Sequence, residues 1–150
     1  MDVKKYMTED LECIEDLLKE LHDNIREWSD VKLLQKASIM FDAFHRRFAL
    51  EDFLLRHVQP TEEMRAALKE FVKVRRAFRE DLESLLLLHA EDPDFRAEIG
   101  KLLERVSKHM VYIKAEFDRN FLDRILTTQL ANLSSDLESK VGAQSFGRRQ

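Results

Sequence analysis

The chain has few residues that form turns or cross-links. Its 150 residues include three glycines, two prolines and a single cysteine, Cys13. Sheet proteins need many turns, so this shortage favours an all-α protein with long helices. One cysteine excludes an internal disulfide, and the N-terminus MDVKKYMTED lacks the apolar run of a signal peptide. We therefore expect a protein of the reducing cytoplasm.

The sequence also lacks a long apolar run and an excess of positive charge. No uncharged apolar run approaches the roughly 18 residues that a membrane-spanning helix needs. The net charge is −4 and the isoelectric point is about 5.8. Arginine pairs are short and scattered, so no basic surface for nucleic acid is indicated. We expect neither membrane insertion nor nucleic-acid binding.

Charged residues and apolar residues at steps of three and four are abundant. This spacing predicts helices over about residues 8–29, 31–58, 62–89 and 93–125. Thr8, Thr61 and Asp92 are the expected N-caps, and Pro93 is expected at the first position of the fourth helix. Long helices with short connections favour an up-down-up-down four-helix bundle over residues 1–126.

A further amphipathic segment follows at residues 127–141. It either prolongs the fourth helix or forms a separate one, and its apolar residues are Leu130, Leu133, Leu137 and Val141. The four earlier helices can already close one core, so this face is the expected contact for a protein partner or a second copy of the chain. Residues 142–150 have little apolar content and are expected to be a disordered tail.

The second helix carries charge within its apolar stripe. The stripe consists of Ala37, Phe41, Phe44, Phe48, Glu51, Leu55 and Val58. A lone buried carboxylate is costly, so Glu51 needs a metal, a basic partner or hydrogen-bond donors. Arg47 lies one turn earlier on nearly the same face. We predict a buried or half-buried ion pair between Arg47 and Glu51.

Two histidines and the cysteine are the remaining candidates for chemistry. His22 and His109 are flanked by apolar residues of the first and fourth helices, so we expect them to face the interior or its edge. Each is either a core histidine or a metal ligand. Cys13 is interpreted as a small apolar filler. No Gly-rich phosphate loop, Cys-pair zinc motif or nucleophile with a base occurs, so we do not expect an enzyme.

Three segments resemble the hemerythrin-like family: LLKELHDNIREW, FHRRFALEDFLLRHVQPTEEMRAALKEFVKVRRAF and LLERVSKHMVYIKAEFDRNFL. The likeness covers about residues 10–122 and consists mostly of apolar positions. It implies a four-helix bundle. Members usually hold two irons with five histidines and two carboxylates, and they bind oxygen or sense oxygen, nitric oxide or iron. The resemblance places His22, Glu51 and His109 at ligand positions.

The second and third helices depart from the family pattern. Arg47 stands at the second-helix histidine position, and the third-helix histidine pair falls near Arg65 and Lys69. No histidine occurs between residues 58 and 88. A protonated arginine or lysine has no free lone pair and repels a second cation. These substitutions therefore oppose metal binding.

The fourth helix departs as well. With His109 at the family's histidine position, the expected carboxylate falls on Ile113 or Lys114. A second register places Tyr112 and Glu116 there instead, but it loses the histidine. At most three of the family's seven ligands are matched in either register.

We therefore expect a non-enzymatic, hemerythrin-like regulatory or protein-interaction module that has lost its di-iron site and holds no cofactor. An interior polar cluster is expected to replace the metal charge, and its members are Arg47, Glu51, Lys69 and Lys114. The alternative is an iron-binding protein that binds or senses oxygen, nitric oxide or iron. Its ligands would be His22, Glu51 and His109.

Overall fold

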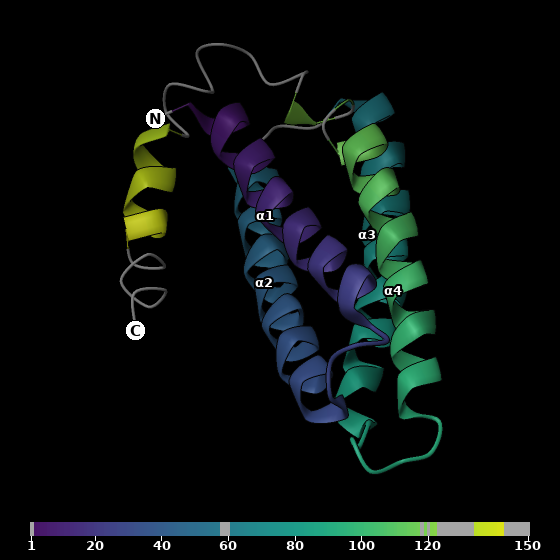
Figure 1. Cartoon of the computed structure of the whole chain (residues 1–150). Helices are drawn as coiled ribbons and strands as arrows, with labels where there is room; N and C mark the ends of the chain where they lie inside the picture. The colour runs from purple at the N-terminus through teal and green to yellow at the C-terminus, as the bar shows by residue number, and fades with distance from the viewer. Residues whose placement is uncertain (1, 58–60, 118, 120, 123–133, 143–150) are drawn as a thin grey trace.

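The computed structural model describes residues 2–57, 61–117, 119, 121–122 and 134–142. The regular elements in these ranges are all helical, which confirms the all-α class. The long helices are α1 (Val3–Asn24), α2 (Asp30–His57), α3 (Glu62–Glu83) and α4 (Phe95–Tyr112) (Figure 1). A 3₁₀ turn, η1 (Ser84–Leu87), continues α3, and a π-helical turn, η2 (Ile113–Phe117), continues α4. Residues 134–142 form a further helical segment.

The four long helices lie side by side with their axes roughly aligned (Figure 1). α1 packs against α2 and α4, and α3 packs against α4. Each helix buries the face on which its apolar residues recur at steps of three and four, and these faces meet in one core. Among the described residues, no helix is both long enough and apolar enough to cross a membrane.

The first helix begins five residues earlier than the sequence predicts. The carboxylate of Asp2 caps α1 by accepting a hydrogen bond from the Lys5 N–H at 3.1 Å. Thr8, the predicted cap, lies inside the helix. The reason is that Val3 and Met7 are both buried, so the apolar stripe continues through one more turn than expected.

Of the N-caps predicted for α3 and α4, one is confirmed and one is wrong. Thr61 is confirmed as the N-cap of α3, because its hydroxyl oxygen accepts from the Met64 N–H at 3.2 Å. Asp92 is not the N-cap of α4, which begins at Phe95. The Asp92 carbonyl instead accepts from the Phe95 N–H at 3.1 Å in a turn that precedes the helix. Phe95 is buried, and its packing sets where the helix starts.

Arg96 connects the start of α4 to the turn between α1 and α2. Its guanidinium donates to the carbonyl of Ile25, to the carbonyl of Trp28 at 3.0 Å and to the carboxylate of Asp30 at 2.5 Å. The last carbonyls of a helix have no partner within the helix and need one from elsewhere. Arg96 supplies it across the interface.

Replacing Arg96 by methionine should lower the free energy of unfolding by about 1–2 kcal/mol, because the turn loses charge-assisted hydrogen bonds. Lys101→Met is the matched control, since Lys101 forms only an exposed pair with Glu98 at 3.3 Å. Its effect should stay below about 0.5 kcal/mol. Urea denaturation measures both, and equal effects would show that Arg96 contributes no more than a surface pair.

The helical segment 134–142 packs against the chain itself. Leu137 is fully buried within the single chain, and the Lys140 ammonium lies 5.6 Å from the ring centroid of Phe53 on α2. The prediction that this apolar face is free for a partner is therefore wrong for Leu137. Leu130, Leu133 and the predicted tail beyond residue 142 lie outside the described residues.

Candidate functional site

The buried face of α2 is centred on two charged side chains. Arg47 and Glu51 are both 0% exposed. The buried residues of this face are Leu33, Ala37, Met40, Ala43, Phe44, Arg47, Phe48, Leu50, Glu51 and Leu54. Phe41 and Leu55, which the predicted stripe included, are only partly buried. The buried face is thus wider than predicted, and it includes Arg47 and Leu54 while Phe41 and Leu55 lie at its edge.

Both oxygens of the Glu51 carboxylate are held by arginines. Arg47 Nε donates to Oε2 at 2.9 Å, and Arg75 Nη1, from α3, donates to Oε1 at 3.3 Å. Arg75 also pairs with the carboxylate of Asp52. Burial raises the pKa of the Glu51 carboxyl, while the positive charges and hydrogen bonds of the two arginines act in the opposite direction.

Arg47 extends the site to α1. Its Nη1 donates to the Met7 carbonyl at 2.8 Å and lies 3.7 Å from the Asp10 carboxylate. The π-helical turn η2 brings Phe117 against the guanidinium, with 5.6 Å between Arg47 Cζ and the ring centroid. Arg47 thereby links three helical elements at one point in the core.

We call Asp10, Arg47, Glu51, Asp52 and Arg75 the buried ion cluster, although the side chain of its outermost member, Asp52, is 45% exposed. Two guanidinium groups meet three carboxylates, and α1, α2 and α3 each contribute at least one member. In a low-dielectric interior such charges are tolerated only when each has a partner, because an isolated buried charge costs several kcal/mol. The cluster is therefore a packed structural element as well as a polar one.

Two lysines that the sequence analysis placed in this cluster lie elsewhere. Lys69 is exposed on α3. Lys114 is exposed on η2 and pairs with Glu15 of α1 at 2.5 Å. Both predictions are corrected, because the side of α3 that carries Lys69 faces solvent and Lys114 points to the surface between α1 and α4.

Sequence analysis missed Arg75 and Asp10, although both carry the signal that identified Glu51. Arg75 lies four residues after Phe71 and three before Phe78, and all three are buried. Asp10 lies three residues after Met7 and four before Ile14, which are both buried on α1. A charged residue within an apolar stripe predicts a buried ion, and that test applied to every helix would have found both.

His109 is buried against aromatic side chains. It is 5% exposed, and its ring stacks on Phe78 with 3.8 Å between centroids and 13° between planes. Burial, with a smaller contribution from the charge of Arg75, lowers the pKa of His109 to about 4. The imidazole is therefore neutral at pH 7. His109 faces the interior, as the sequence predicts, and packs there as an aromatic ring.

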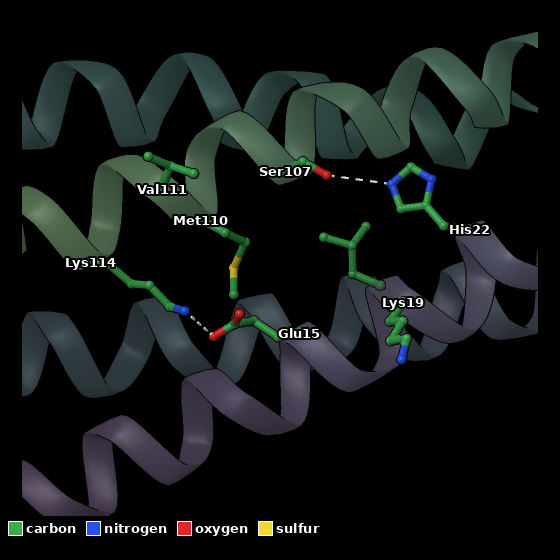
Figure 2. Close-up of a pocket in the computed structure, with 8 residues that line it drawn as sticks. Glu15, Lys19, His22, Ser107, Met110, Val111 and Lys114 are labelled. Carbon is green, nitrogen blue, oxygen red and sulfur yellow. Dashed lines mark hydrogen bonds and ion pairs between the residues drawn. The ribbon is translucent and has the colours of Figure 1, made fainter.

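His22 lies at the edge of the core. It is exposed, and it borders a groove of about 340 Å³ between α1 and α4 (Figure 2). Its Nε2 lies 3.4 Å from Ser107 Oγ, while the pair of Lys114 and Glu15 occupies the other end and Met110 projects between them. His22 therefore lies apart from the buried ion cluster.

The contact between His22 and Ser107 is not the arrangement of an activated nucleophile. A catalytic serine passes its proton to the imidazole, whereas Ser107 donates its hydroxyl to the Leu103 carbonyl at 3.0 Å. Cys13 was expected to be a buried filler, but it is exposed.

The ligand set inherited from the family resemblance does not fit a metal. His22 is at the surface, His109 stacks on Phe78, and both oxygens of Glu51 accept from arginines. Within the described ranges no group of three or more histidine, cysteine, aspartate or glutamate side chains is placed to hold a metal ion.

Comparisons with protein-family models, with curated proteins and with solved structures find no match to this chain.

Proposed function

We propose that the chain is a hemerythrin-like, up-down-up-down four-helix bundle that works without a metal, as a non-enzymatic regulatory or protein-interaction module. One observation carries the proposal. The carboxylate that the resemblance places at the bridging position, Glu51, has each oxygen hydrogen-bonded to a buried arginine. Arg47 and Arg75 supply the positive charge that a metal would otherwise bring.

Metal binding at this position would have to displace buried guanidinium groups. Removing one partner from a buried ion pair costs roughly 3–5 kcal/mol, and the released arginine would still repel the incoming cation. Arginine also offers no lone pair to a metal. The cluster therefore favours a closed, metal-free interior over a di-iron centre.

A closed interior leaves the surface as the functional part of the molecule. Large apolar side chains lie exposed at several points of that surface: Val31, Ile39, Leu86, Leu87 and Val111. Adjacent exposed apolar side chains mark sites of protein contact more often than isolated ones do. This pattern supports a protein-interaction role over a catalytic one.

The test is elemental analysis and an absorption spectrum of the full chain purified from iron-replete cells. We expect well below one iron per chain and no absorption band beyond the near-ultraviolet tail of the protein. A hemerythrin-family protein made in the same cells is the control for iron loading. Two irons per chain, or a spectrum that responds to oxygen or azide, would instead establish the iron-binding alternative.

A further inference from the structure

The 3₁₀ turn η1 leaves two neighbouring leucines in solvent. Leu86 and Leu87 are 68% and 77% exposed, whereas Leu85 is buried and Leu88 packs partly against the core. Successive residues of a 3₁₀ turn point about 120° apart, so four leucines in a row cannot all face inward. Both outward positions are leucine, although water solvates a polar side chain better at an exposed position.

The two leucines border a groove on the surface. The groove measures about 670 Å³ and lies between η1 and α2, from which Phe41 and His45 contribute. Phe41 packs partly against the core and forms an edge-on contact with His45, with 4.4 Å between ring centroids. We call this surface the leucine groove. It presents aliphatic and aromatic side chains to the same opening.

The rim of the leucine groove is acidic. Glu80 and Glu83 of α3 line it and are exposed. No lysine or arginine of the described chain is among its lining residues. The helical backbone of α3 and η1 ends at Leu87, so the negative end of its dipole also lies beside the groove. Carboxylates and dipole together favour a cationic ligand beside the leucines.

We propose that the leucine groove binds an amphipathic helix of a partner protein, with apolar residues on one face and lysine or arginine beside them. The apolar face of such a helix would cover Leu86, Leu87 and Phe41, and its cations would meet Glu80 and Glu83. An anionic lipid surface is disfavoured, because the rim carries the same charge as the lipid. This inference rests on the proposed interaction role and specifies its surface.

The probe is a synthetic helix of about four turns, with leucine at helix-face spacing and lysine beside it. Its binding to the full chain is followed by fluorescence anisotropy. Leu86→Ser with Leu87→Ser should weaken binding by more than about tenfold, because the apolar contact is lost. Glu80→Gln with Glu83→Gln should also weaken it and reduce its salt dependence, because the attraction to the lysines is lost. A peptide with glutamate in place of lysine should not bind.

Val111→Ser is the matched control, since Val111 is 69% exposed on α4 and does not line the groove. This variant should bind the probe like the unaltered chain, and circular dichroism should show that all variants fold. Failure of the unaltered chain to bind, or unchanged binding by the leucine variant, would overturn the proposal. A dimer in sedimentation that the leucine variant abolishes would also overturn it, because a second copy would then occupy the groove.

Iron content is measured on the same preparations, so the two proposals are tested separately. A metal-free chain that does not bind the peptide would reject only the proposal that the leucine groove binds a helix. A chain that holds two irons and binds the peptide would reject only the proposal that the protein works without a metal.

Discussion

Glu51→Leu should lower the free energy of unfolding by roughly 3–5 kcal/mol, because buried Arg47 would keep only the more distant carboxylate of Asp10, at 3.7 Å. Arg47→Met should cost a similar amount, since Glu51 would keep only the longer bond from Arg75, at 3.3 Å. The double variant should recover most of the loss. Leucine at position 51 would complete the apolar face of α2 between Phe48 and Leu54, and neither charge of the pair would remain.

Chemical denaturation of the four proteins gives the coupling energy between the two positions. Lys114→Met is the control, because its pair with Glu15 is exposed and should be worth no more than about 1 kcal/mol. Two neutral single variants with no coupling would mean that the side chains reach solvent. A costly Glu51 variant beside a neutral Arg47 variant would identify Arg75 as the principal partner.

His109 should make the protein less stable in acid. Its pKa is about 4 in the folded chain, against an ordinary histidine value of 6.5. Between these values the unfolded state binds more protons, so the contribution is complete above pH 6.5 and is lost as the pH falls toward 4. The full loss is on the order of 3 kcal/mol.

Comparison with His109→Phe isolates this contribution. Phenylalanine retains the stacking on Phe78, and all other titrating groups stay common to both proteins. One of these is Glu51, whose raised pKa acts in the opposite sense, because the folded state then binds protons more readily as the pH falls. The stability difference between the two proteins should change with pH.

Nuclear magnetic resonance measures the pKa of His109 directly. The imidazole should remain neutral down to about pH 5, given its pKa of about 4. Titration near the ordinary histidine value would show that the ring reaches solvent and would remove the predicted acid sensitivity.

Helix positions and most buried faces follow from the spacing of apolar residues. From α4 through η2 and just beyond, the apolar residues at steps of three and four are all buried, and they are Ile99, Leu103, Val106, Met110, Ile113, Phe117 and Phe121. On α2 the spacing allows two nearly equivalent faces, one with Phe41 and Leu55 and one with Met40 and Leu54. Contacts of Arg47 with Met7 and Asp10 favour the second face, and those partners lie about 40 residues away in sequence.

The family resemblance could not identify Arg75, the member of the buried ion cluster on α3, for a geometric reason. Counting from Pro60 places the equivalent position at Lys69, whereas the charge that reaches Glu51 comes from Arg75. Six residues along an α-helix correspond to about 600° of rotation, which leaves the two side chains on different sides. Only the observed packing of α3 shows which of them faces the interior.

Arg96 also affects the order in which the molecule can mature. The groups it holds in the α1–α2 turn precede it by 66 to 71 residues, so they leave the ribosome well before it does. Until α4 emerges, the carbonyls of Ile25 and Trp28 have only water as a partner, and the apolar face of α1 that packs on α4 stays uncovered. The hairpin of the first two helices therefore cannot bury all of its apolar surface before α4 has been made.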